Sequence, residues 1–381
     1  MKVLILSCNC GEGHNSAGKA VAEQFCRYGI PCELRDTLSF ESERASRFVG
    51  NVHAKSALYA PRLFEIGNEF AAREGRAGRD SIFYRANTTY AGRLYRYICE
   101  NGFDTIVMPH VFPAEALTCI RRRYPDAARL TTCFIATDYA CLPFLGETDA
   151  DLYCIPHEYL RYDFMESGVP AHKLAATGIP VRTPFLTHTE KTEARTRLGL
   201  PAERKLLLVM TGSMGYGNAE ALVSALRVRI PEAGVLVMGG SNERLKRTLR
   251  TSFAVDPQVS VLDYTNEVSL YLDAADLLFT KPGGLSSTEA AVKGIPMVHT
   301  APIPGWESDN AAFFENLGLS RTGDTPEAQA EQAAALLASP EAMARMCEYQ
   351  RREINPHAAE DICALLLARA QEAEPQECAI I

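Results

Sequence analysis

The sequence predicts an α/β protein made of two doubly wound, Rossmann-like domains that face each other across a cleft. Three observations lead to this fold class. The chain has 381 residues, which exceeds the usual size of one domain. Short apolar runs rich in β-branched residues alternate with helical periodicity, as in mostly parallel sheets. A segment with two closely spaced prolines, Gly178–Pro184, separates two such alternating series.

In the first half, each apolar run has the composition of a buried strand, and helical sequence lies between the runs. The predicted elements are strands at Val3–Ser7, Thr105–Met108 and Thr132–Ile135, a strand that follows from Pro31–Leu34, and helices at Ser16–Tyr28 and Pro113–Arg123. Residues 40–101 mix aromatic and basic side chains and predict helices inserted into this half. These helices either pack on their own domain or form a surface that meets lipid.

The second half repeats the pattern. Its predicted elements are strands at Lys205–Met210, Gly234–Met238, Val259–Leu262, Leu277–Phe279 and Pro296–Val298 and helices at 190–200, Ala219–Arg229, Glu243–Thr251 and Asp361–Ala370. We expect an N-terminal domain at 1–186, a C-terminal domain at 187–355, and a terminal helix and tail at 356–381 that packs back toward the N-terminal domain. Ligands of such sheets bind beyond the carboxyl ends of the strands, which places the expected site in the cleft.

Composition narrows the possible functions. The chain is 47% hydrophobic and 23% charged, as in globular proteins, and its net charge of −8 argues against nucleic-acid binding. Residues 1–140 have a net charge of +3 and the remaining residues a net charge of −11, so the first half could still contact an anionic surface. We find neither a signal sequence nor an apolar run that could span a membrane, and expect a cytoplasmic protein with reduced thiols. We interpret Cys8, Cys10 and His14 as parts of a loop rather than as zinc ligands.

The first motif, Gly11-Glu12-Gly13-His14, follows the first predicted strand. Glycines let a ligand approach the backbone, and the N-terminus of the next helix offers unpaired N–H groups. His14 stands where it can act on such a ligand; the alternative is a tight turn capped by Asn15 or Ser16. The segment nearly fits a P-loop, but Ala20 occupies the position where Ser or Thr must hold Mg²⁺, which argues against an NTPase.

Two glycine-rich turns in the second half have the same strand–turn–helix arrangement. Thr211–Asn218 follows one predicted strand, and Phe279–Glu289 follows another. The second turn opens a helix whose N-terminus can bind a diphosphate, and Glu289 can reach a ribose diol. Pro302–Asn310 then offers carboxylate and amide groups of the kind that sugar hydroxyls require.

These motifs carry a resemblance to a known family. The chain resembles the monogalactosyldiacylglycerol synthases and processive diacylglycerol glucosyltransferases, a group similar to the transferase that adds N-acetylglucosamine to the peptidoglycan lipid precursor. Trp306 and Asp309 depart from the family pattern, and Glu12 breaks its triple glycine. The segments that match in order are Gly11–His14, Pro109–Pro113, Thr137–Tyr139, Gly178–Val181, Lys281–Glu289 and Pro302–Asn310.

The resemblance implies a GT-B fold and an inverting transfer of a hexose from a UDP-sugar to a lipid acceptor, by a peripheral protein on the cytoplasmic face of the cell membrane. It implies no cofactor and no metal. It also implies roles for individual residues. Glu289 binds the ribose, Glu307 and Asn310 bind the sugar, and His14 lies at the reacting centre. The diphosphate is held by Gly212, Ser213, Met214, Gly215, Gly283, Gly284, Ser286, Ser287 and Thr288, with Gly13 in the facing loop. We favour glucose over galactose as the hexose.

Several alternatives stay open at this stage. Transfer needs a base for the attacking hydroxyl, and Asp138 rivals His14 for that role. The pair Asp149 and Asp151 resembles the metal–sugar motif of another transferase fold, but it precedes a strand start and we do not assign it a metal. We expect His110 to be structural. The rival functions are N-acetylglucosamine transfer to the peptidoglycan precursor or a soluble glycoside, a nucleotide-sugar epimerase, and a nucleotide-sugar sensor.

Overall fold

The computed structural model describes residues 1–8, 11–42, 44, 81–142, 145–211, 218–303 and 306–373. Two parallel six-stranded sheets organise this part of the chain. The first contains β1 (Val3–Ser7), β2 (Cys32–Asp36), β3 (Thr105–Met108), β4 (Thr131–Ile135), β5 (Leu152–Ile155) and β6 (Leu174–Ala176). The second contains β7 (Leu206–Met210), β8 (Gly234–Met238), β9 (Val259–Leu262), β10 (Leu277–Thr280), β11 (Met297–His299) and β12 (Arg321–Thr322).

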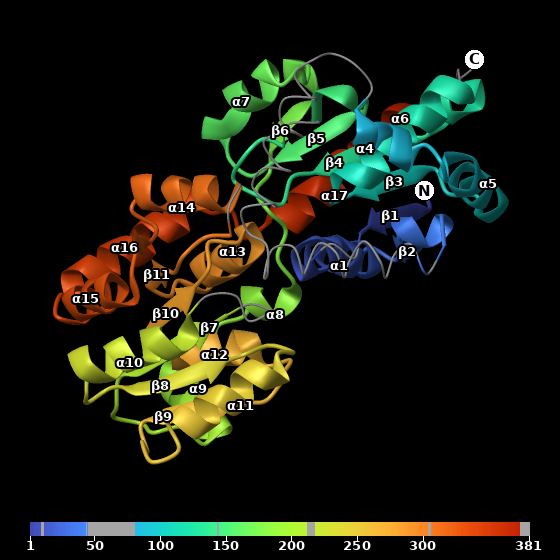
Figure 1. Ribbon diagram of the computed structural model, residues 1–381. Coiled ribbons are helices and arrows are strands. Elements are labelled where there is room, and N and C mark those ends of the chain that lie inside the picture. Colours follow the sequence, from blue (N-terminus) through green and yellow to red (C-terminus); the bar gives the residue numbers. More distant parts are fainter. Residues whose placement is uncertain are drawn as a thin grey trace.

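Helices cover both sheets (Figure 1). In the first half these are α1 (Glu12–Arg27), α4 (Ile82–Asn87), α5 (Ala91–Asn101), α6 (Val111–Arg123), α7 (Arg161–Glu166) and α8 (Thr183–Leu186). In the second half they are α9 (Lys191–Leu198), α10 (Ala219–Arg229), α11 (Glu243–Ser252), α12 (Val268–Ala274), α13 (Gly284–Lys293), α14 (Trp306–Asn316), α15 (Pro326–Leu337), α16 (Pro340–Glu353) and α17 (Ala358–Ala373). The fold class predicted from the sequence is confirmed.

Strand order places the candidate site. The first sheet runs β2-β1-β3-β4-β5-β6, and the second runs β12-β11-β10-β7-β8-β9. The order in which the chain adds strands therefore changes direction between β1 and β3 in the first sheet, and between β7 and β10 in the second. Ligands of parallel sheets bind beyond the strand ends at such reversals. The helices that follow β1 and β10 are α1 and α13, which carry the first and third glycine-rich motifs.

Both of these helices begin earlier than the sequence suggested. We expected the first helix from Ser16 and the other helix only after the glycines of the Phe279–Glu289 turn, but α1 begins at Glu12 and α13 at Gly284. Gly11 precedes α1 with φ of 147°, a conformation that residues with a Cβ rarely adopt, so the chain turns sharply from β1 into the helix. His14 consequently lies in the first turn of α1, and the proposed capping by Asn15 or Ser16 is wrong.

The described part of the 40–101 insertion packs on its own domain. Helices α4 and α5 both contact α6, and Tyr90 and Leu94 are buried there. Asn87 donates a 2.6 Å hydrogen bond to the buried carboxyl of Glu115 on α6. The lipid-facing interpretation of residues 40–101 stays a prediction, since residues 43 and 45–80 lie outside the described residues.

The terminal helix α17 packs against α1 and β4 of the first half (Figure 1). Its side chains Ile362, Cys363 and Leu366 are fully buried in a cluster with Val3 and Phe25. The chain therefore returns to the N-terminal sheet after completing the C-terminal one, and the two halves are joined at more than the single crossover near Gly178–Pro184.

A buried carboxylate links helix α9 to the start of β7 in the second sheet. Asp276, just before β10, accepts 2.7 and 2.8 Å bonds from the Arg195 guanidinium and the Leu206 amide, and Lys191 lies 2.9 Å away. Burial alone would raise the pKa of Asp276, but the Leu206 amide, Lys191 and Lys205 hold it below its ordinary value. Its contribution to stability is present at neutral pH and is lost only as the pH falls through this lowered pKa.

We expect Asp276→Asn to lower the free energy of unfolding by about 3 kcal/mol at neutral pH, because it leaves the buried Arg195 without its charge partner. Urea unfolding followed by circular dichroism measures this change. The control is Asp263→Asn, which removes an ion pair between the exposed side chains of Asp263 and Arg250 and should change stability little. Equal effects of the two substitutions would contradict the assignment.

Candidate active site

The first turns of α1 and α13 meet where the two halves face each other (Figure 1). A Cβ on Gly13 would lie 3.7 Å from the Leu285 side chain. A Cβ on Gly284 would lie 2.1 Å from the carbonyl oxygen of Thr137, at the end of β4. Only glycine fits at position 284, so this residue permits backbone-to-backbone contact between the halves. The juncture thus involves the glycine-rich motifs of both halves, with His14 directly after Gly13 and Gly283 directly before Gly284.

His14 is held by hydrogen bonds that fix its tautomer. Its Nδ1 lies 2.8 Å from the carbonyl oxygen of Pro109 and 2.8 Å from Oγ1 of Thr137. A carbonyl oxygen can only accept, so Nδ1 carries the proton and the neutral ring keeps its lone pair on Nε2. Among the described residues, none is found hydrogen-bonded to Nε2. The His14 ring also meets that of His110 edge to face, at 4.5 Å between centroids.

The surroundings of His14 favour the neutral ring. Burial lowers its pKa below the ordinary value, although the nearby Asp138 carboxylate and the Pro109 carbonyl act in the opposite direction. A neutral imidazole with a free Nε2 can accept a proton at physiological pH. His110 instead caps α6, because its Nδ1 accepts a 3.1 Å bond from the Phe112 amide. This agrees with the structural role expected for His110.

Asp138, the rival base, is engaged across the domain junction. Its Oδ1 accepts a 2.8 Å hydrogen bond from Nδ2 of Asn310 on α14. The side-chain carbonyl of the same Asn310 accepts a 2.6 Å bond from the Tyr139 amide. Asn310 is fully buried, and both the nitrogen and the oxygen of its side-chain amide are hydrogen-bonded to the loop that carries Asp138 and Tyr139. Its assignment as a sugar-binding residue stays a prediction.

The predicted diphosphate cradle is partly covered. Ser287 and Thr288 are fully buried: Ser287 Oγ lies 3.0 Å from His299 Nε2, and Thr288 donates to the Gly284 carbonyl. Gly283 and Ser286 keep part of their surface accessible at the start of α13. The cradle residues Gly212, Ser213, Met214 and Gly215 lie outside the described residues.

Two acidic residues of the predicted site are also buried. Burial raises the pKa of Glu289 to about 8, with Arg182 of the interdomain crossover acting in the opposite direction, so Glu289 is mostly protonated at neutral pH. Glu307 pairs with Lys281 through Oε1 and accepts a 2.8 Å bond from the Ile303 amide through Oε2. The Lys281 Nζ lies 3.6 Å from where a Cβ of Gly283 would be, so a cation stands at the start of α13.

The carboxylates of Asp149 and Asp151 already have cationic partners. Asp149 accepts a 2.6 Å bond from Lys173, and Asp151 pairs with Arg121 and with the Thr132 amide. Within the described part of the chain, no cluster of three His, Cys, Asp or Glu side chains is arranged to hold a metal ion. These contacts explain the acidic pair as structural.

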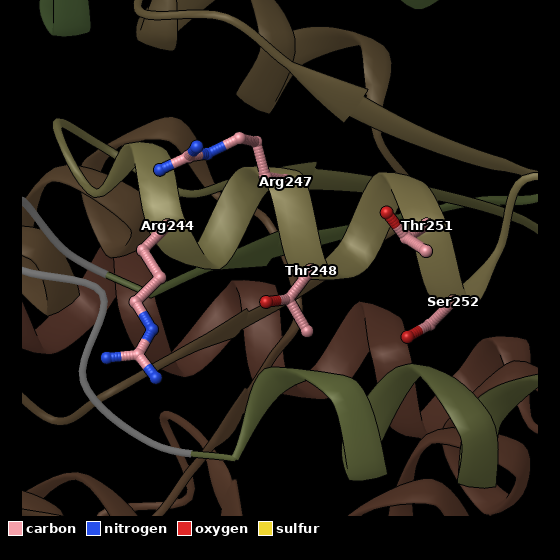
Figure 2. Close-up of a pocket in the computed structure, with 5 residues that line it drawn as sticks. All are labelled: Arg244, Arg247, Thr248, Thr251 and Ser252. Atoms are coloured by element: carbon pink, nitrogen blue, oxygen red, sulfur yellow. The ribbon is translucent and has the colours of Figure 1, made fainter.

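A separate surface cavity of about 380 Å³ lies on α11. Figure 2 shows its five lining side chains, with Arg244 and Arg247 extending in different directions from the helix. Ser252, at the other end of the cavity, donates to Glu220 of α10. The lining side chains are all exposed, and none belongs to the predicted site. This cavity therefore lies apart from the residues of the predicted site.

Sequence reasoning did not assign roles to Pro109, Thr137, Tyr139 and Lys281. The first two follow β3 and β4, which succeed β1 in the sheet, so their proximity to His14 could have been found from the strand order. Lys281 follows β10 directly and precedes the glycines of the cradle. The position of Tyr139 depends on how the two halves dock, which no local pattern encodes.

Comparison with known proteins places the chain in a family. A family model described as monogalactosyldiacylglycerol (MGDG) synthase matches residues 14–181. The processive diacylglycerol β-glucosyltransferase of Staphylococcus saprophyticus is 30% identical over 371 residues, covering 96% of this chain and 92% of that protein. The chain belongs to the monogalactosyldiacylglycerol synthase and processive diacylglycerol glucosyltransferase family. It is thus a glycosyltransferase, as its motifs suggested.

Other comparisons agree with this family and with the fold. The Bacillus subtilis processive diacylglycerol β-glucosyltransferase is 27% identical, with 91% of this chain and 89% of that protein covered. The structure of MurG from Acinetobacter baumannii has a TM-score of 0.61 at 16% identity, covering 97% of this chain and all of that chain. A UDP-GlcNAc 2-epimerase from Neisseria meningitidis has a TM-score of 0.63 at 12% identity, with the same coverage. At such identities these two structures show the GT-B fold alone. The family match does not favour the peptidoglycan transferase, epimerase or sensor alternatives.

Burial of His14, which lowers its pKa, predicts an acidic limb in the pH profile of this glycosyltransferase. The log of kcat/KM should fall with unit slope as His14 becomes protonated, at a pH below the value of about 6.5 that is usual for histidine. Initial rates between pH 4.5 and 8.5 measure this limb. A limb that persists unchanged in His14→Asn would contradict the assignment.

The contact at Gly284 predicts a severe effect of one methyl group. Gly284→Ala should lower kcat/KM at least tenfold, because the new Cβ would overlap the Thr137 carbonyl and force the halves apart. Steady-state rates and the midpoint of thermal unfolding measure both consequences. Gly92→Ala on α5 is the control, since its Cβ would meet only Tyr124 Oη at 3.5 Å. Full activity of Gly284→Ala would show that this contact is not needed.

Proposed function

We propose that this chain transfers a hexose, glucose or galactose, from a UDP-sugar to diacylglycerol or a glycosyl-diacylglycerol, with inversion at the anomeric carbon and without a metal ion. The observation that carries the proposal is the imidazole of His14, poised as a neutral base where the first turns of α1 and α13 meet. The choice of substrates is supported by the names of the relatives, which are diacylglycerol glucosyltransferases.

In the proposed reaction, His14 Nε2 takes the proton from the acceptor hydroxyl as its oxygen attacks the anomeric carbon. The bond between that carbon and the diphosphate oxygen breaks, and UDP leaves with the electron pair. Free amides at the start of α13 and the Lys281 ammonium stabilise the charge that develops on the diphosphate. Inversion follows because the hydroxyl attacks from the face opposite the leaving group.

The donor is proposed to bind along α13. Gly283, Gly284 and Ser286 face the diphosphate, and Glu289 binds the ribose. A protonated Glu289 can both donate to one ribose hydroxyl and accept from the other. Glu307 contributes indirectly, by holding Lys281, as well as through any contact with the sugar. We retain glucose as the favoured hexose, in agreement with the names of the relatives.

The acceptor is a membrane lipid in this proposal, so the protein works at a membrane surface. Among the described residues, no helix is long and apolar enough to cross a membrane. We propose peripheral binding at the cytoplasmic face. The positive net charge of residues 1–140, in an otherwise acidic chain, supports contact between the first half and anionic lipid.

The test offers UDP-glucose, UDP-galactose and UDP-N-acetylglucosamine with diacylglycerol vesicles and resolves the products by mass. We expect glycosyl-diacylglycerol from a UDP-hexose, with His14→Ala lowering kcat by about 10²- to 10⁴-fold. EDTA should leave the rate unchanged. UDP release that does not depend on lipid would instead favour an epimerase or hydrolase and overturn the proposal.

A further inference from the structure

One aromatic side chain crosses from the N-terminal half into the C-terminal half. Tyr139, on the loop after β4, is 2% exposed and lies between α13 and α14. Its ring stacks on Phe313 at 4.6 Å between centroids and meets Phe314 edge to face at 5.0 Å. The loop that carries Thr137 and Asp138 is therefore anchored in the donor-binding half by the residue that follows them.

The hydroxyl group of Tyr139 makes a directed contact. It lies 2.8 Å from Oγ1 of Thr288 on α13. The Thr288 hydroxyl donates its own hydrogen to the Gly284 carbonyl at 2.7 Å, so it accepts from Tyr139. Buried polar groups need partners, and this pair satisfies both hydroxyls without water. The contact thus sets the loop against the first turns of α13 in one orientation.

The same loop holds His14. Thr137 Oγ1 accepts from His14 Nδ1, and the Thr137 carbonyl rests on Gly284. A continuous series of contacts therefore runs from α13 through Tyr139 and Thr137 to the imidazole. A shift of the loop by a fraction of an ångström would move the imidazole relative to the donor.

We propose that Tyr139 and Thr288 are positioning residues, whose hydrogen bond across the junction keeps His14 aligned with the sugar donor on α13. This inference rests on the proposed function. It concerns how the base is aligned and assigns neither residue a contact with the acceptor.

The alternative is that Tyr139 only holds the two halves together. Another contact between the halves separates these roles. His157, after β5, pairs with Glu353 of α16 at 3.3 Å, and both side chains are largely buried. This pair joins the halves but does not belong to the loop that bears Thr137. If Tyr139 only held the halves together, breaking either contact should change kcat to the same extent.

The experiment compares Tyr139→Phe, Thr288→Val and the double variant with Glu353→Gln. Each single change at the first contact should lower kcat about three- to tenfold, the worth of one buried hydrogen bond, with KM for the UDP-sugar within twofold. The double variant should be no slower than the slower single variant, because both changes remove one bond. Glu353→Gln should keep kcat within twofold of the unmodified protein.

Thermal unfolding and UDP titration on the same four proteins show that each is folded and binds nucleotide. Wild-type kcat in Tyr139→Phe, additive losses in the double variant, or an equal loss in Glu353→Gln would each overturn the inference while leaving the proposed function intact. Absence of transfer by the unmodified protein would overturn the proposed function, and the inference with it.

Discussion

The candidate site depends on the close approach of two helix starts. Helices α1 and α13 each follow a strand at a reversal of strand order, and their first turns meet across the junction. Gly284 makes this possible, because any larger residue would overlap the Thr137 backbone. Beside this approach, Nδ1 of His14 bonds to the Pro109 carbonyl and to Thr137 Oγ1. Burial lowers the pKa of His14 and keeps the ring neutral.

The charges around this junction are compatible with the proposed release of UDP. Lys281 stands at the start of α13, where the partial positive charge of the helix N-terminus also lies. Glu307 holds Lys281 in place, and burial keeps Glu289 mostly uncharged at neutral pH. In the proposed reaction, the Lys281 ammonium and the start of α13 therefore lie on the diphosphate side, while His14 of the other half supplies a neutral base. This division matches the needs of glycosyl transfer.

The sequence predicted the elements whose pattern is local. Val3–Ser7 and Gly234–Met238 are buried along their whole length, so they read as continuous apolar runs. Leu174–Ala176 and Arg321–Thr322 were missed because these edge strands are short and partly exposed. The start of α1 was placed too late because Gly-Glu-Gly-His has the composition of a loop.

The site was predictable only in part, for a related reason. A glycine-rich turn after a strand identifies His14 and Gly284 without knowledge of the rest of the fold. The contacts of Tyr139 with Thr288 and Asn310 join residues 149 and 171 positions apart, in different halves. They depend on the docking of two separate sheets, and no periodicity or composition reports that geometry.

The protonation state of the His14 ring decides whether a base is present where α1 and α13 meet. Long-range ¹H–¹⁵N correlation spectra of the protein labelled with [¹⁵N]histidine distinguish the three forms of the ring, and His14→Gln identifies its signals. At pH 7.5 we expect a neutral ring with a protonated Nδ1 and an unprotonated Nε2. A ring protonated on Nε2, alone or together with Nδ1, would leave no base facing the junction and would contradict this expectation.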